Sequence, residues 1–228
     1  MAIFQVNLAG ILKVLSDSLY STQDVFVREL LQNGVDAITA KTLQTDFAPA
    51  IKVSYFRHER GDGLIVQDNG IGLTPEQAEA FLSRIGASSK SLSQLQASRV
   101  DFIGQFGIGL LSCFMVSDEI TVITRAYGAA AGVKWVGNID GSYHTEAAEV
   151  DFQGTRVILT LRPAANLTPE KLRHLLDRYG AYLPVPLTYE IDDAPQEALQ
   201  RQFPWEVGQD HDAILDLGME QFHLPFSH

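Results

Sequence analysis

The sequence predicts an α+β fold, a two-layer sandwich in which one mixed, mostly antiparallel sheet carries helices on one face. Two observations favour this class. Helical and strand-like segments are interspersed without strict βαβ alternation, and two of the strands are joined by a short turn, as in an antiparallel hairpin. A chain of 228 residues with 46% hydrophobic residues can also bury a full core without a metal or disulfide.

Helical periodicity opens the chain. Apolar residues recur at helical spacing over residues 4–19, which predicts an amphipathic helix. Ser21 or Thr22 is expected to cap a second helix, which would carry Asp24 in its first turn and run to about Lys41.

The next segments alternate between strand and helix signals. Residues 51–56 and 64–67 predict two strands that pair as a hairpin around a turn at 57–63. Thr74, followed by a proline and then by a glutamine at the third helical position, predicts a helix that ends near Gly86.

Further along the chain, residues 87–99 lack strong periodicity and are expected to be mobile. A helix is expected after the glycines that end at Gly109, and strands are predicted at 120–125, 133–139 and 155–161. Thr168 is expected to cap a helix that reaches about Tyr179.

The end of the chain changes character. Beyond Pro186 the sequence is acidic and contains several prolines, so it is predicted to be irregular. We therefore expect residues 1–190 to form one domain and residues 191–228 to be a linker or the start of a truncated further domain.

Charge and composition exclude several classes of protein. The net charge of −11 argues against a protein that wraps nucleic acid. We expect no membrane association, because no run of about 20 apolar residues occurs. The first ten residues lack the pattern of a signal peptide, and Cys113 is the single cysteine, so a cytoplasmic location is expected.

Three polar residues are expected to share one face of the second helix. Glu29, Asn33 and Asp36 are spaced at i, i+4 and i+7. The Asn33 amide oxygen suits a Mg²⁺ ligand, and Glu29 suits a base that activates water. An ordinary solvated helix face would have the same pattern.

Asp68 directly follows a predicted strand, within the sequence DNGIG. It is a candidate to accept a hydrogen bond from an adenine amino group, although Asp-Asn-Gly is also common in turns. Thr155, in GTRV, could hydrogen-bond Asp68 and a water beside the base. Both motifs are weak when taken alone.

A glycine-rich segment, GQFGIG, precedes a predicted helix. Such glycines let backbone N–H groups approach phosphates at a helix N-terminus. The spacing at 104–109 is G-x-x-G-x-G, and no Walker lysine follows it, so neither a Rossmann nor a P-loop nucleotide site is favoured.

The order of these four motifs resembles that of the GHKL ATPases, which include gyrase-type topoisomerases, mismatch-repair ATPases, sensor histidine kinases and the heat shock protein 90 chaperones. Three longer stretches resemble the bacterial-type heat shock protein 90 family in particular, over about residues 4–190. They are FQVNLAGILKVLSDSLYSTQDVFVRELLQNGVDA, GQFGIGLLSCFMVSDEITVITR and YLPVPLTYE.

The resemblance implies a GHKL (Bergerat-type) sandwich that binds ATP or ADP with Mg²⁺. It implies that Glu29 is the catalytic base, that Asn33 is the metal ligand and that residues 73–103 form a lid over the nucleotide. The residues expected to contact nucleotide are Asn33, Asp36, Ala37, Asp68, Gly72, Leu73, Lys90, Gly104, Gln105, Phe106, Gly107, Ile108, Gly109, Leu110 and Thr155.

The resemblance further implies a molecular chaperone whose lid closure is coupled to the folding of client proteins, and a homodimer of the full-length protein. The sequence departs from the family at Leu110, where an aromatic residue is usual, and in IGASSK at 85–90, where one basic residue is lost. Because the family takes a phosphate-sensing arginine from a middle domain, this chain alone is expected to hydrolyse ATP slowly or not at all. Two alternatives stay open: another GHKL ATPase, and a regulatory module that binds nucleotide without hydrolysis.

Overall fold

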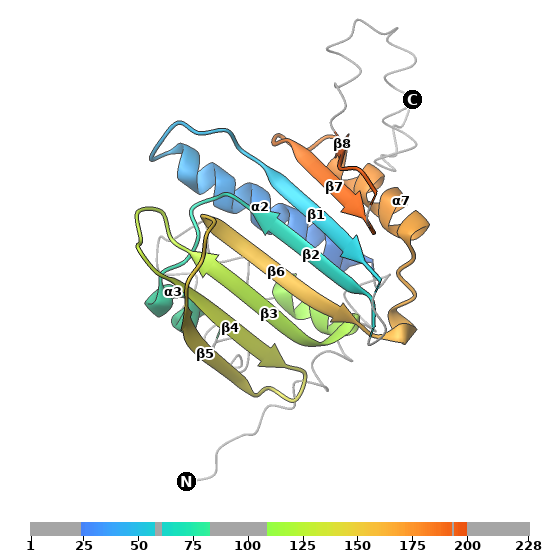
Figure 1. Cartoon of the computed structure of the whole chain (residues 1–228), viewed down its shortest axis with the longest axis horizontal. Helices are drawn as coiled ribbons and strands as arrows, with labels where there is room; N and C mark the ends of the chain where they lie inside the picture. Colours follow the sequence, from blue (N-terminus) through green and yellow to red (C-terminus); the bar gives the residue numbers. More distant parts are fainter. Residues whose placement is uncertain (1–23, 58–60, 83–108, 193, 200–228) are drawn as a thin grey trace, which may run out of the picture.

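The computed structural model describes residues 24–57, 61–82, 109–192 and 194–199, which build one eight-stranded sheet with helices on one face (Figure 1). The strand order is β5-β4-β3-β6-β2-β1-β7-β8. The strands are β1 (Ile51–Phe56), β2 (Gly63–Asp68), β3 (Ser117–Arg125), β4 (Gly132–Asn138), β5 (Tyr143–Ala148), β6 (Gly154–Leu161), β7 (Leu187–Ile191) and β8 (Glu197–Leu199). The α-helices are α2 (Val25–Thr42), α3 (Pro75–Leu82) and α7 (Pro169–Gly180), and the 3-10 helices are η1 (Leu110–Met115) and η2 (Pro163–Ala165).

The pairing of the strands confirms a mixed, mostly antiparallel sheet. β1 and β7 run parallel, and every other neighbouring pair described is antiparallel. The predicted hairpin is β1 and β2, which pair from Ile51 with Asp68 to Phe56 with Gly63. The α+β sandwich predicted from the sequence is therefore confirmed.

Strand periodicity decides which side chains face the helices. On β2, Leu64, Val66 and Asp68 are buried, and they alternate with more exposed residues. Ile51 and Val53 of β1 lie opposite Asp68 and Val66 and are buried on the same face. Because side chains alternate with a period of two, Asp68 occupies the last position of a row that is otherwise apolar.

Helix α2 covers the middle of the sheet. It contacts β1, β2 and β6, and Figure 1 shows it running behind these strands. Phe26, Leu31 and Ile38 are each about 1% exposed and form the apolar stripe that packs on the sheet. Burying each such side chain contributes about 1.5–3 kcal/mol, which holds the helix against the strands.

The structure places the start of α2 later than the sequence predicts. Asp24, expected within the first turn, is the N-cap residue, and it makes no side-chain hydrogen bond to the helix backbone. Its carboxylate instead lies 2.6 Å from Lys171 Nζ on α7. This ion pair between two helices is a tertiary contact that local capping patterns do not contain.

The two other predicted caps are confirmed. Thr74 Oγ1 accepts a hydrogen bond from Gln77 N at 3.2 Å, and Gln77 Oε1 accepts one from Thr74 N at 2.9 Å. This reciprocal pair is a capping box. Thr168 Oγ1 likewise accepts from Lys171 N at 3.2 Å and caps α7.

Three strands were missed, and one helix is of another type. β5 is an edge strand whose residues are mostly exposed, so it lacks an apolar alternation. The prediction that the chain is irregular beyond Pro186 is wrong for the described residues up to 199, because β7 pairs with β1 and β8 pairs with β7. The helix expected after Gly109 is present as the 3-10 helix η1. The helix predicted at 4–19 and the segment at 87–99 lie outside the described residues.

The cap of α7 allows a test of the fold. Replacing Thr168 by Ala leaves the amide N–H at the helix start without its side-chain acceptor, and should lower the free energy of unfolding by about 1 kcal/mol. Thr168→Ser, which retains the hydroxyl, should stay close to wild type. Urea denaturation followed by circular dichroism measures both, and equal midpoints for the Ala and Ser variants would contradict the role of the cap.

Candidate functional site

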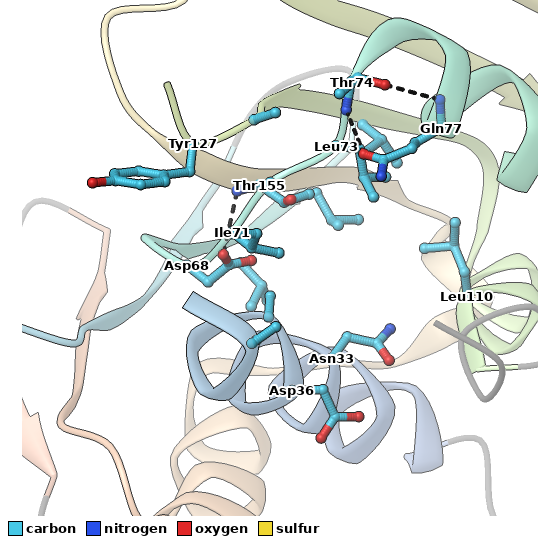
Figure 2. A pocket seen from close by; sticks show the side chains of 18 of the residues that line it. Asn33, Asp36, Asp68, Ile71, Leu73, Thr74, Gln77, Leu110, Tyr127 and Thr155 are labelled. Carbon is cyan, nitrogen blue, oxygen red and sulfur yellow. Dashed lines mark hydrogen bonds between the residues drawn. The ribbon is translucent and has the colours of Figure 1, made fainter. Parts of the chain in front are cut away.

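A cavity of about 400 Å³ lies between α2 and the helix-covered face of the sheet, open beside α3 and η1 (Figure 2). Eight of the residues predicted to contact nucleotide line it. They are Asn33, Asp36, Ala37, Asp68, Gly72, Leu73, Leu110 and Thr155. The fold thus brings residues from four separate parts of the chain to one cavity.

Asp68 is the buried carboxylate of this cavity. Only 8% of the residue is exposed, and its Oδ1 accepts hydrogen bonds from Gly70 N at 2.8 Å and Thr155 N at 3.3 Å. Burial raises the pKa of Asp68 to about 7, although both hydrogen bonds and the positive charge of Lys41 act in the opposite direction. Because both recorded hydrogen bonds end on Oδ1, Oδ2 can accept a further donor.

Thr155 holds Asp68 through its backbone, whereas its side chain contacts Thr124. The two hydroxyl oxygens lie 3.0 Å apart, and Thr124 Oγ1 also donates to Gly154 O at 3.1 Å and accepts from Leu73 N at 2.9 Å. Since Thr124 gives its single proton to Gly154, Thr155 is the donor between the two hydroxyls. The Thr155 oxygen therefore keeps a free lone pair to accept a hydrogen bond from a ligand.

Two rows of side chains run across β2, β6 and β3 beneath the cavity. One row is polar and consists of Asp68, Thr155 and Thr124. The register places Thr155 on β6 opposite Thr124 on β3, and Asp68 is the last residue of the neighbouring strand β2. The next row consists of Val66, Val157 and Val122, which all line the cavity. The floor of the cavity therefore offers a hydrogen-bonding edge beside a flat apolar surface.

Two glycines let the loops close around Asp68. Gly72 has a φ of +65°, and a Cβ added there would lie 2.1 Å from Arg125 O. Gly154 has a φ of +104°, and a Cβ there would lie 2.3 Å from Asp68 O. Any side chain at these positions would both strain the backbone and push the loops apart.

Gly70 serves the packing of its loop rather than the wall of the cavity. Gly72 lines the cavity, whereas Gly70 is absent from its described lining. A Cβ on Gly70 would lie 2.5 Å from the carbonyl carbon of Ala37, so this glycine allows the loop to pack on α2. Ile71 N then donates to Ala37 O at 2.9 Å and anchors the loop to the helix.

Asn33 and Asp36 reach the cavity from α2, and Figure 2 shows Asn33 extending beneath Leu110. Asp36 Oδ1 accepts a hydrogen bond from Gln32 Nε2 at 2.8 Å. Leu110 is 4% exposed and forms part of the apolar wall. The Asn33 amide therefore faces this end of the cavity, whereas the Asp36 carboxylate points away from Leu110 (Figure 2).

Glu29 lies outside the described lining of the cavity. Its Oε1 accepts from Arg28 Nη2 at 2.8 Å. A Cβ added to Gly109 would lie 2.8 Å from Glu29 Oε2, so the carboxylate sits directly beside the start of η1. Of the other predicted contacts, Lys90, Gly104, Gln105, Phe106, Gly107 and Ile108 lie outside the described residues.

Sequence reasoning missed several residues of the site. Thr124 was detectable, because it interrupts the apolar alternation of Ile120 and Val122 on β3 with a buried hydroxyl. Thr124 supports the site from behind its wall, and the missed residues that line the cavity itself carry no local signal of their own. They are Leu30, Gly34, Ala40, Gln44, Val66, Ile71, Thr74, Gln77, Val122, Ala126, Tyr127 and Val157.

Comparison with known proteins identifies the family. Residues 20–160 match the family described as histidine kinase-, DNA gyrase B- and HSP90-like ATPases. The chain belongs to this family. Its GHKL fold and ATPase domain therefore agree with the resemblance drawn from the sequence.

Relatives named chaperone protein HtpG are similar to most of the chain. The protein from Actinobacillus succinogenes is 33% identical over 219 residues, covering 89% of this chain and 35% of the relative. Those from Geobacter metallireducens and Bordetella avium are 31% and 32% identical and cover 82% and 93% of this chain. The chain spans about a third of the length of these relatives.

Two further properties concern the described residues of this HSP90-like ATPase domain. None of their helices combines the length and apolar character that a membrane span requires. Their His, Cys, Asp and Glu side chains form no cluster of three or more that could hold a metal ion. A Mg²⁺ ion that accompanies a nucleotide needs only one or two protein oxygens, since phosphate oxygens and water complete its shell, so the amide oxygen of Asn33 fits such an ion.

The raised pKa of Asp68 predicts how the stability of the nucleotide-free domain depends on pH. An unfolded Asp ionises near pH 4, whereas folded Asp68 ionises at about pH 7. The stabilising contribution of protonated Asp68 is thus complete below about pH 4 and is lost as pH rises to 7. Asp68→Asn cannot ionise, so it should become more stable than wild type, by up to about tenfold in the folding constant per pH unit across this range.

Urea denaturation of wild type and Asp68→Asn at several pH values between 5 and 8 measures this difference. Nucleotide must be absent, because a ligand that binds the ionised form would mask it. Parallel stability profiles for the two proteins would show that Asp68 does not carry the predicted linkage.

Proposed function

We propose that the cavity binds Mg²⁺-ATP through its adenine base, and that the chain is the ATP-binding and ATP-hydrolysing domain of a chaperone related to HtpG. The observation that carries the proposal is Asp68, a buried carboxylate with Oδ1 held by two backbone N–H groups and Oδ2 left to accept from an adenine amino group. The apolar row of valines beside it suits the flat face of the base.

Each end of the cavity has a role in this proposal. Asp68 and the Thr155 hydroxyl orient the base, and the backbone at Gly72 and Leu73 lies along its edge. Asn33 Oδ1, with Asp36 nearby, faces the phosphate end and would hold Mg²⁺, which neutralises phosphate charge when bound. Lys90 and residues 104–108 are proposed from sequence alone to complete the phosphate site.

Hydrolysis is assigned to Glu29 as the base that takes a proton from the attacking water. Glu29 lies one helical turn before Asn33 and beside Gly109, which supports a position at the phosphate end. Glu29 is paired with Arg28 and lies outside the described lining of the cavity, so in this proposal it exchanges that partner to reach the attacking water.

A second candidate function is nucleotide binding without hydrolysis. The observation that favours it is the same pairing of Glu29 with Arg28 at 2.8 Å, outside the described cavity wall. A DNA-dependent member of the family is less well supported, given the net charge of −11 and the HtpG relatives. Client proteins, a homodimer and a cytoplasmic location belong to the whole protein and stay predictions.

Adenine recognition is tested by replacing Asp68 with Asn. The amide keeps an oxygen for Gly70 N and Thr155 N but presents an NH₂ group to the adenine amino group, so ATP and ADP affinity should fall at least about a hundredfold. Isothermal titration calorimetry measures the loss. Wild type should also bind inosine triphosphate at least about tenfold more weakly than ATP, because its carbonyl replaces the amino group. Unchanged ATP affinity in Asp68→Asn would remove the basis of the proposed function.

The catalytic assignment is tested with Glu29→Ala. This variant should bind ATP within about threefold of wild type yet, in the full-length protein, lose phosphate release by about a hundredfold or more in a single-turnover assay. Glu119→Ala, which removes an exposed carboxylate on β3, is the matched control and should resemble wild type. ATP binding by wild type without any phosphate release, in this chain and in the full-length protein, would instead favour the non-hydrolysing alternative.

A further inference from the structure

Lys41 is a buried lysine in the last turn of α2 that the nucleotide site described above does not use. The residue is 5% exposed, although lysine is almost never buried without a partner. It is absent from the described lining of the cavity, to which this end of α2 contributes Ala37 and Ala40, and the residues just beyond α2 contribute Gln44. Any effect of Lys41 on a nucleotide must therefore pass through other residues.

The Lys41 ammonium joins two loops that are far apart in sequence. Nζ donates to Asn69 O at 2.7 Å and to Gln153 Oε1 at 3.2 Å. It also lies 4.1 Å from the ring centre of Phe47 and 5.8 Å from that of Tyr127, so aromatic faces cover the charge. These contacts account for how a charged group is tolerated in a buried position.

The two loops are those that hold Asp68. Asn69 lies between Asp68 and Gly70, whose N–H donates to the carboxylate, and Gln153 immediately precedes the segment that brings Thr155 N to it. Fixing one atom in each loop therefore fixes the spacing of the two N–H donors around Oδ1.

Asn69 is itself anchored on a third segment of the chain. Its Nδ2 donates to Ala48 O at 2.7 Å, and its Oδ1 accepts from Ala50 N at 2.9 Å. The loop after β2 is thus tied to the residues before β1, and Lys41 extends this support across to Gln153.

The charge of Lys41 has an effect separate from its hydrogen bonds. Burial lowers the pKa of Lys41, while Asp68 raises it. In turn, the positive charge of Lys41 lowers the pKa of Asp68 against the larger effect of burial. Among the described residues, Asp68 is the charged side chain that shifts the pKa of Lys41, and Lys41 is the charged side chain that shifts the pKa of Asp68. The neighbours Asn69, Gln153 and Phe47 are neutral.

An apolar residue at position 41 could fill the same space without burying a charge, and replacements of this kind are often neutral or stabilising. A purely structural role thus explains the packing of the lysine stem but not the need for an ammonium group. The ammonium group is hydrogen-bonded to the two loops that hold Asp68, and this position explains why a charged lysine rather than an apolar residue stands here.

We propose that Lys41 is a positioning residue for nucleotide binding, whose ammonium ties together the two loops around Asp68 and supplies the positive charge that balances this carboxylate. The inference rests on the proposed function, since it concerns how the adenine-binding carboxylate is prepared. Lys41 touches neither the base nor the phosphates.

Four variants separate the charge from the hydrogen bonds. Lys41→Met removes both and keeps the length of the stem, whereas Lys41→Arg keeps the charge. Gln153→Ala removes one acceptor and leaves the charge in place. Lys52→Met removes a lysine that pairs with Glu190 on the sheet, outside the described cavity lining, and is the matched control.

The first measurement needs no nucleotide. The ¹³C NMR signal of the Asp68 carboxyl group, assigned by its absence in Asp68→Asn, is titrated in each variant. In Lys41→Met the titration midpoint should move up by about one pH unit, while Lys41→Arg, Gln153→Ala and Lys52→Met should stay near wild type.

The second measurement is ADP affinity by calorimetry between pH 6 and 9. Wild type should lose up to about tenfold in affinity per pH unit below 7, as Asp68 takes up a proton. Lys41→Met should show this loss about one pH unit higher, so that it binds about fivefold more weakly at pH 7, about tenfold more weakly at pH 6, and approaches wild type at pH 9. Lys41→Arg should restore the pH profile.

The outcomes distinguish this inference from the proposed function. If wild type binds no adenine nucleotide, the proposed function fails, and the carboxyl titration still tests the effect of Lys41. If wild type binds but Lys41→Met shifts neither the titration nor the pH profile, the positioning role is wrong. An affinity that falls equally at every pH, with an unchanged carboxyl titration, would show that the charge of Lys41 does not act on Asp68. Should Lys41→Met fail to fold, Lys41→Gln, which keeps a donor for Asn69 O, serves in the same two measurements.

Discussion

A single buried carboxylate constrains the whole site. Asp68 is the last residue of β2, and its side chain points to the same buried face as those of Leu64 and Val66. Its charge therefore lies where the fold would otherwise bury another apolar side chain. A carboxylate in this position is tolerated only when hydrogen bonds and a nearby positive charge compensate for lost hydration. Gly70 N, Thr155 N and the Lys41 charge act in this direction, and together they still leave the pKa near 7.

This constraint explains why two loops must approach so closely. The backbone at Gly154 comes within a contact distance that no Cβ would allow, and Gly72 does the same against Arg125. Thr124 then links both loops, because its hydroxyl contacts Gly154 O and Leu73 N. The rigid sheet beneath aligns the polar row beside the valine row, so the site presents a preformed shape complementary to a molecule with one polar edge and one flat face.

The parts of this arrangement that could be predicted from the sequence are local ones. The β1–β2 hairpin, the capping box at Thr74 and the cap at Thr168 depend on neighbouring residues, and Asp68 follows its strand directly in the chain. Lys41 and Thr124 depend on partners more than twenty-five residues away, with Asn69 separated from Lys41 by 28 positions and Thr155 from Thr124 by 31. β7 carries buried Leu187, Tyr189 and Ile191, yet the prolines and acidic residues around it obscure this alternation. The family resemblance predicted the roles of individual residues, but the contacts that support them had to come from the three-dimensional structure.

Asp68 in the cavity and Glu29, which lies beside Gly109 outside the described lining, differ in how firmly their carboxylates are held. Asp68 is bonded to backbone groups within the core, and moving it would leave a buried charge without partners, which is costly. Glu29 is paired with the adjacent Arg28, whose side chain is 54% exposed, and such a pair contributes only about 0–1 kcal/mol. Glu29 can therefore exchange its partner at little cost, whereas Asp68 cannot. Under the proposed function, the end of the cavity at Asp68 would be organised before a nucleotide arrives, whereas Glu29 could reorient after it has bound. Binding followed by hydrolysis requires this order of events.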